Sequence, residues 1–138
     1  MPAKHFASAA ATLGASLALV ACGGDSNDSG ASTTEQASAS VALKEAGETR
    51  DALTAALAAY KTGDKQAAED QVAEAYLQHF EEVEHALEER DAALKEKLEE
   101  AINSELRDAM KAGKPAAEIE AQVDTVVADL QKAEAALR

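Results

Sequence analysis

Residues 72–87 read Val-Ala-Glu-Ala-Tyr-Leu-Gln-His-Phe-Glu-Glu-Val-Glu-His-Ala-Leu, and this stretch decides the fold class. Its larger apolar residues recur every three or four positions. That spacing places them on one face of an α-helix, whereas a half-buried strand would need alternation with a period of two. The stretch is therefore predicted to be an amphipathic helix. The apolar face consists of Val72, Tyr76, Phe80, Val83 and Leu87.

The same spacing recurs in three further segments of the chain. One begins near Glu48 or somewhat earlier and carries Leu53, Leu57 and Tyr60; the others cover about 91–112 and 115–137. From residue 41 onward, Ala, Glu, Leu and Lys dominate, and these are strong helix formers. No segment alternates with a period of two. We therefore expect an all-α domain over residues 41–138.

Three short breaks separate these segments. They are 62–64 (Thr-Gly-Asp), 90–91 (Arg-Asp) and 113–115 (Gly-Lys-Pro). Asp64 and Asp91 are suited to cap the helices that follow them, and Pro115 fits the first turn of the last helix. Because short loops join antiparallel neighbours, an antiparallel up-down four-helix bundle is predicted. The break at 90–91 is the weakest, so helices two and three are either separate or continuous.

The N-terminus has the pattern of a bacterial lipoprotein signal. A weakly basic start is followed by an apolar run from Phe6 to Val20, which is shorter than the roughly 20 residues of a membrane span. The chain's single cysteine, Cys22, follows Leu-Val-Ala and precedes Gly-Gly-Asp-Ser. We expect residues 1–21 to be a cleaved signal peptide and Cys22 to be lipidated. This predicts a cell-envelope protein anchored through palmitate or similar chains on the extracytoplasmic side of a membrane.

The segment after the cysteine is polar and rich in small residues. Residues 23–40 contain no large apolar side chain, so they cannot bury enough surface to offset the entropy of ordering. We therefore expect residues 22–40 to be a lipidated cysteine and a flexible tether. The predicted organisation is signal 1–21, tether 22–40 and helical domain 41–138.

The chain is strongly acidic. It has 13 basic and 26 acidic residues, and removal of residues 1–21 takes away only Lys4, which leaves 12 against 26 and a formal charge of −14. Nucleic acids and anionic lipid headgroups reward Lys/Arg clusters, so neither is an expected partner. The charge favours cations and basic partners. The alternative is that it keeps the surface soluble and does nothing more.

A cation site is conceivable on the second helix. Glu81 and Glu84 lie one turn apart, and His85 follows Glu81 by four residues, so all three lie near one another on the helix. Carboxylate oxygens suit hard cations such as Fe³⁺, and an imidazole nitrogen suits Fe²⁺, Zn²⁺ or Cu²⁺. A second helix would have to complete the site. Its candidate ligands are Glu99, Glu100 and Glu105, of which Glu100 is taken here as the ligand.

The same residues have a simpler interpretation. The glutamates form a solvated face, and Glu84 pairs with Arg107 or with a lysine. Residues 82–85 contain Glu-x-x-His, but a di-iron bundle needs two copies of that motif and the chain has one. His79 is interpreted as a half-buried packing residue. No phosphate-binding loop or nucleophile arrangement is present in the sequence, so an enzyme is not expected.

The second helix also resembles a known family. Its residues match the pattern Ala-Tyr-Leu-x-x-Phe-Glu-x-hydrophobic-Glu of the extracytoplasmic helical domains associated with high-affinity iron permeases of bacteria. The next helix and the closing 132–137 are similar as well, although Asn103 stands where an aromatic residue is common. The matching residues are Ala75, Tyr76, Leu77, Phe80, Glu81, Val83 and Glu84, followed by Glu100, Leu106, Arg107 and Ala109.

The resemblance implies a role in iron uptake. The chain ends where the membrane-embedded permease would begin, so we expect a stand-alone accessory rather than the channel. Its partner would be an iron permease or another envelope protein, and its cargo a metal cation, with iron first. The alternative function is a structural or protein-interaction lipoprotein that binds no ligand.

Overall fold

The computed structural model describes the backbone of residues 29–138 and the side chains from residue 38 onward. Within this part of the chain every regular element is helical and no strand occurs. The predicted signal peptide, Cys22 and the first part of the predicted tether lie outside the described residues. The all-α prediction is confirmed.

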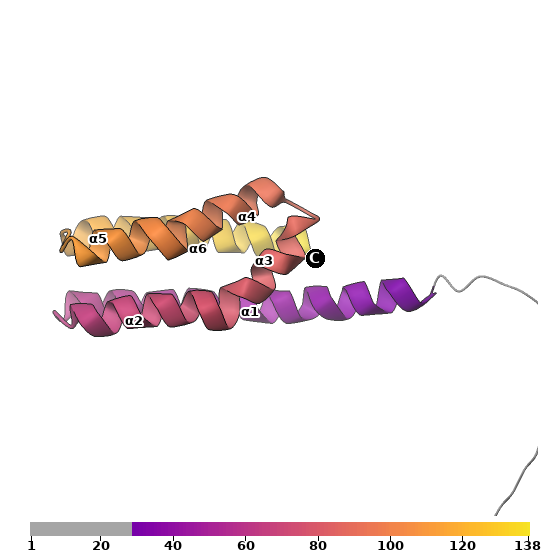
Figure 1. Ribbon diagram of the computed structural model, residues 1–138, viewed down its shortest axis with the longest axis horizontal. Helices are drawn as coiled ribbons and strands as arrows, with labels where there is room; N and C mark the ends of the chain where they lie inside the picture. Colours follow the sequence, from indigo (N-terminus) through magenta and orange to yellow (C-terminus); the bar gives the residue numbers. More distant parts are fainter. Residues whose placement is uncertain (1–28) are drawn as a thin grey trace, which may run out of the picture.

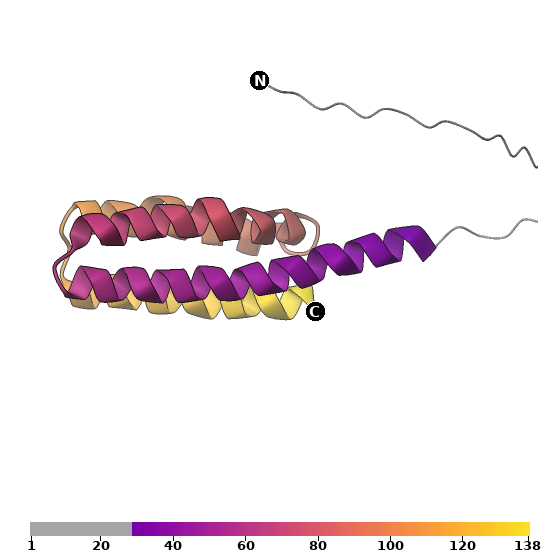
Figure 2. The same cartoon turned by 90° about the horizontal axis from the view of Figure 1, so that it is seen from below.

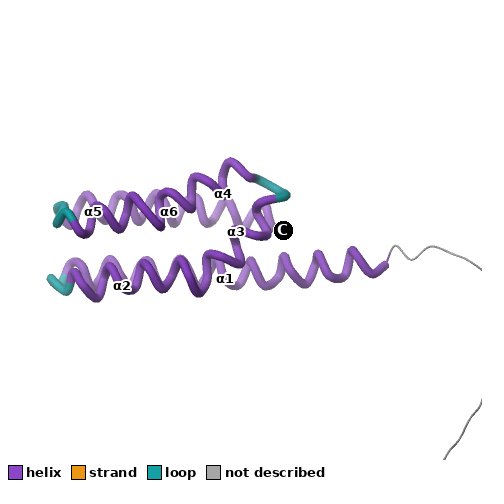
Figure 3. Tube along the Cα trace, viewed as in Figure 1, coloured by secondary structure: helices purple, strands orange, loops and turns teal. Residues whose placement is uncertain are grey.

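The described helical segments join into four helices (Figure 3). Two of these helices contain a π-helical segment, labelled η, between α-helical parts. A turn at 89–91 interrupts the chain between the second and third helices, so these two are separate. The first helix is α1 (Ser29–Lys61); the second is α2 (Lys65–Ala75), η1 (Tyr76–Phe80) and α3 (Glu81–Glu88); the third is α4 (Ala92–Glu99), η2 (Glu100–Leu106) and α5 (Arg107–Lys111); the fourth is α6 (Ala116–Leu137).

The predicted helix boundaries are confirmed at their caps. Asp64 Oδ1 accepts a hydrogen bond from the backbone N–H of Ala67 at 3.2 Å, and Asp91 Oδ1 accepts one from Leu94 at 3.0 Å. Each satisfies one of the backbone donors that a helix start leaves without an intrahelical partner. Pro115 lies one residue before α6, where its missing N–H costs no hydrogen bond.

The first helix begins much earlier than the sequence suggests. Helix α1 starts at Ser29, so residues 29–40, predicted to belong to a flexible tether, are helical. Ala39 is buried although it belongs to that segment. Adding a residue to an existing helix fixes little backbone for each new hydrogen bond, and the alanines in this segment favour it. The N-terminal end of α1 extends past the other helices (Figure 2).

The helices form two layers (Figure 1). Helices α1 and α2 lie side by side in one layer, and the α4–η2–α5 helix lies beside α6 in the other. Segment α3 crosses from the first layer towards the second, directly after the π-helical segment η1. This crossing brings α3 against α4 and α6, and it determines where the glutamates of α3 lie.

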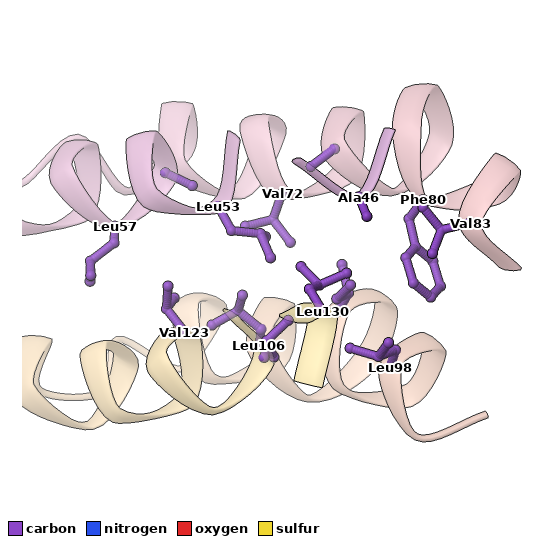
Figure 4. Packing of buried hydrophobic residues seen from close by; sticks show 14 of the residues in the cluster. Ala46, Leu53, Leu57, Val72, Phe80, Val83, Leu98, Leu106, Val123 and Leu130 are labelled. Atoms are coloured by element: carbon purple, nitrogen blue, oxygen red, sulfur yellow. The ribbon is translucent and has the colours of Figure 1, made fainter. Parts of the chain in front are cut away.

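The core fills the space between the layers (Figure 4). The predicted apolar face of the second helix is buried, except that Tyr76 is half-buried at its edge. It meets side chains from all the other helices, which include Leu53, Leu98, Leu106 and Leu130. Apolar contact between the layers is therefore the main force that holds the four helices together.

Candidate functional site

The predicted ligands of the second helix lie on the first two turns of α3. Val83 and Leu87 are fully buried, and this anchors the orientation of the segment. Glu84 follows the buried Val83 and is half-buried, with 24% of its side chain exposed. Glu81 and His85 are exposed. Of the three, Glu84 alone is placed where the bundle constrains it.

A lysine from the next helix occupies the region around Glu84. Lys95 Nζ lies 3.5 Å from Glu84 Oε1, 3.0 Å from Glu88 Oε2 and 3.7 Å from Glu99 Oε2. We call these four residues the Lys95 cluster. The hydrogen bond with Glu88, supported by the charges of all three carboxylates, raises the pKa of Lys95 above its ordinary value. The ammonium therefore stays charged throughout the physiological range.

Tyr76 joins this cluster to the core. Its hydroxyl donates to Glu84 Oε2 over 3.4 Å, and its ring packs against Phe80 with the ring centroids 5.7 Å apart. Burial raises the pKa of Tyr76, and the charges of Glu84 and Glu99 raise it further. Tyr76 therefore acts as a hydrogen-bond donor to Glu84.

The cluster combines three carboxylates with one ammonium, a formal charge of −2 if all four groups are ionised. Its geometry matches the simpler interpretation of the sequence, in which Glu84 pairs with a lysine. The other predicted partner, Arg107, instead donates to Asn103 Oδ1 at 3.0 Å. The ammonium of Lys95 thus lies among the three carboxylates and pairs with each of them.

The remaining candidate ligands lie apart from this cluster. Glu100 and Glu105 are exposed on η2. His85 lines a cavity of about 170 Å³ together with Ser38 on α1 and Glu89. Among the described residues, no group of three or more His, Cys, Asp or Glu side chains is arranged to hold a metal ion. The predicted set Glu81, Glu84, His85 and Glu100 therefore stays a prediction.

His79 has a partner that the sequence did not suggest. It is half-buried, as predicted, and its Nδ1 lies 2.7 Å from Glu45 Oε2 on α1. The hydrogen bond with His79, with help from Lys44, lowers the pKa of Glu45. The pair ties η1 to α1. Glu45 lies 34 residues before His79 on another helix, so spacing along the sequence did not suggest this contact.

A buried carboxylate on α6 was also missed. Asp129 is 5% exposed, and Lys97 Nζ and Lys132 Nζ each lie 2.7 Å from one of its oxygens. Burial by itself raises the pKa of Asp129, but hydrogen bonds from Lys132 and Lys97 lower it by more. A sequence signal existed, because Asp129 lies three residues after Val126 and four before Ala133, both in the core.

Comparison with protein-family models, curated proteins and solved structures finds no match to this chain. The resemblance to the iron-permease-associated domains therefore rests on the sequence motif alone. Within the described part of the chain, no helix combines the length and apolar character that a membrane crossing requires.

Proposed function

We propose that this chain is a lipid-anchored cell-envelope protein whose helical bundle acts by binding another protein. The observation that carries this choice over metal transport is the position of Lys95. Its ammonium lies within 3.7 Å of Glu84, the best-buried of the predicted ligands on α3, and of two neighbouring glutamates. A metal ion would have to displace a lysine that is tied to the same groups, so the cluster is a structural one.

The anchor is part of the proposal. It is supported by the position of Cys22 after Leu-Val-Ala and before a polar segment. Helix α1 begins at Ser29, seven residues after Cys22 in the sequence. A lipid on Cys22 would therefore hold the bundle near the membrane surface.

The antiparallel up-down topology is also proposed. It is supported by the short turns, in which Gly63 and Gly113 have φ values of +93° and +68° that L side chains rarely adopt. Each turn follows the end of one helix and precedes the start of the next within a few residues. Tyr60 Oη donates to the carbonyl of Lys114 at 2.7 Å and links the first turn region to the last.

Metal relay for iron uptake is the second candidate function. One observation favours it: Tyr76, Glu84 and Glu99 bring oxygen atoms into a cluster with an excess of negative charge. Oxygen ligands suit Fe³⁺. In this candidate function a ferric ion would replace Lys95 as the counterion of the glutamates.

Thermal unfolding of the full-length chain in detergent distinguishes the two candidates. A ligand that binds only the native state raises Tm. If the cluster is structural, Fe³⁺, Fe²⁺, Zn²⁺ and Cu²⁺ leave Tm unchanged in the wild type. An increase that Glu81→Gln and Glu84→Gln abolish would favour metal relay and contradict our proposal.

Protein binding and anchoring need separate measurements. Chemical cross-linking in intact membranes should yield a discrete adduct that contains this chain and a second protein. Its absence would contradict a partner-binding role. Replacement of Cys22 by Ser should abolish incorporation of labelled palmitate and release the protein from the membrane fraction. Unchanged membrane fractionation would contradict the anchor.

A further inference from the structure

A groove runs between η2 and α6. It has a volume of about 270 Å³ and is open to solvent. Ala101 and Ala121 leave it hollow because neither has a side chain beyond Cβ, and Val126 adds an apolar wall. The lining residues are Ala101, Glu105, Ala121, Gln122, Thr125 and Val126.

The groove contains an unsatisfied hydrogen-bond acceptor. Gln122 Oε1 is shielded from solvent and accepts no hydrogen bond from the described residues. The nearby hydroxyl of Thr125 cannot serve it, because it donates to the carbonyl of Ala121 at 2.8 Å. A buried polar atom without a partner is unfavourable. A donor that enters the groove and a small rotation of the Gln122 amide would relieve this.

One wall of the groove is distorted. Segment η2 (Glu100–Leu106) is π-helical and supplies Ala101 and Glu105. Single π-helical turns carry an extra residue and occur often at functional sites. Here the π-helical turn places an alanine and a carboxylate on the groove, with the small residue at the floor and the exposed acid at the rim.

We propose that this groove, between η2 and α6, binds a basic amphipathic helix of a partner protein. Helices pack into the grooves between neighbouring helices, and the alanine floor allows a close approach. The occupant carries small apolar residues on the face towards the groove and lysine or arginine beside it. Glu105 at the rim and the chain's formal charge of −13 attract such a helix. A second copy of this chain, with the same negative charge, is repelled.

A second hollow gives a control surface. It lies between α1 and α2, has a volume of about 190 Å³, and also has an alanine floor and a buried Gln71 Oε1 without a partner. It also has a glutamate, Glu74, and it differs from the η2–α6 groove in its smaller volume and in containing His79, whose ring is held by Glu45. We therefore assign the partner helix to the η2–α6 groove and not to this one.

The test uses the full-length chain in detergent and two synthetic peptides. One is an amphipathic helix of Leu, Ala and Lys, and the other has Glu in place of every Lys. Fluorescence anisotropy measures their binding at physiological salt. We expect the basic peptide to bind, and Ala121→Leu, which fills the groove, to weaken it by at least about tenfold. Ala55→Leu, which fills the α1–α2 hollow, should leave binding unchanged. Both alanines are exposed, so neither substitution disturbs the core.

Several results would overturn the inference. Equal binding of the basic peptide to wild type and Ala121→Leu would mean that charge alone attracts it. Equal binding of the two peptides, or no binding of either, would remove the charge argument. Self-association that Ala121→Leu abolishes, seen by analytical ultracentrifugation, would make a second copy the occupant.

This inference rests on the proposed protein-binding function, but the two fail differently. If Ala121→Leu leaves the membrane cross-link intact, the chain has a partner that binds elsewhere. This result would contradict the groove assignment and leave the protein-binding function standing. If the peptide binds the groove but no cross-linked partner is found, the protein-binding function is contradicted, whereas the groove is still shown to bind a basic helix.

Discussion

Two charged clusters in this protein use opposite arrangements of the same groups. At Asp129, one buried carboxylate is held by two lysines, Lys97 and Lys132, whose side chains are more than half exposed. In the Lys95 cluster, one lysine is surrounded by three carboxylates, two of which are well exposed. The first cluster has an excess of positive charge, and the second an excess of negative charge.

The difference shows what burial does to an ion pair. The carboxylate of Asp129 has lost its water, so it depends on its two lysines. The glutamates of the Lys95 cluster keep part of their hydration, and solvent screens their attraction to the lysine. The Asp129 cluster should therefore matter for stability, whereas the Lys95 cluster mainly occupies the place that a cation would need.

The largest effect is expected when Asp129 loses both lysines. The double substitution Lys97→Met and Lys132→Met leaves a buried carboxylate without a partner and should cost about 3 kcal/mol of unfolding free energy. Urea unfolding at neutral pH measures this loss. The matched double substitution to Arg keeps both charges and should preserve most of the stability. A loss of less than about 1 kcal/mol for the Met variant would contradict the difference between the clusters.

The next effect is a dependence on acid. The pKa values of Asp129 and Glu45 are lowered in the folded state. Their contribution to stability is therefore complete above the unfolded values, near about pH 4, and is lost as the pH falls through the lower folded values. Urea unfolding between about pH 2 and 6 should show stability rising with pH. Asp129→Asn should flatten this rise, and an unchanged slope would argue against a lowered pKa at Asp129.

A smaller effect is expected at the Lys95 cluster. Lys95→Met removes the ammonium that pairs with the three carboxylates of this cluster. Their mutual repulsion then lowers the unfolding midpoint. The decrease should be roughly half or less of that for the double lysine variant, and added salt should reduce it further. Lys95→Arg is the control that keeps the charge. If Lys95→Met destabilises as much as the double variant, the glutamates are more dependent on the lysine than their exposure suggests.

Metal titration of this same variant sharpens the comparison. Because Lys95→Met leaves the three carboxylates without their ammonium, Fe³⁺ should raise the Tm of this variant while the wild type stays unchanged. Lys95→Arg should behave as the wild type does. If Fe³⁺ does not raise the Tm of the Met variant, these glutamates do not bind the metal even when the Lys95 ammonium is absent.

The smallest effect is expected at Glu88. This residue is 60% exposed and is one of three acids around Lys95. Glu88→Gln should leave the unfolding midpoint unchanged within error, because exposed ion pairs contribute little. A clear decrease, measured in the same urea titration, would mean that the hydrogen bond between Glu88 and Lys95 is the main contact of the cluster.

Much of the fold could be predicted because it depends on local patterns. The stripe from Val72 to Leu87 is buried as its spacing requires, and Asp64 and Asp91 cap the helices that follow them. The beginning of α1 was predicted too late because small polar residues after Gly30 do not announce a helix, although they can extend one. The π-helical segments were not predicted from the sequence either.

The candidate site was harder to predict because it combines separate helices. The cluster of glutamates on the second helix was visible, and so was a lysine partner for Glu84, but the identity of that lysine was not. Lys95 is the lysine that pairs with Glu84 because α3 crosses between the layers and packs against α4. Asp129 on α6 meets Lys97 on α4 in the same way, whereas Lys132 lies three residues further along α6 itself.

By itself, the sequence determined the helical class, the helix breaks and the strongly acidic character of this protein, because periodicity, capping residues and charge are properties of neighbouring positions. It also contains the lipoprotein pattern at Cys22. Only the tertiary structure decided which charges neutralise one another and where the surface is hollow. Those outcomes depend on which helix faces pack together, and the buried apolar area that drives this packing does not specify from a single segment which partner it will meet.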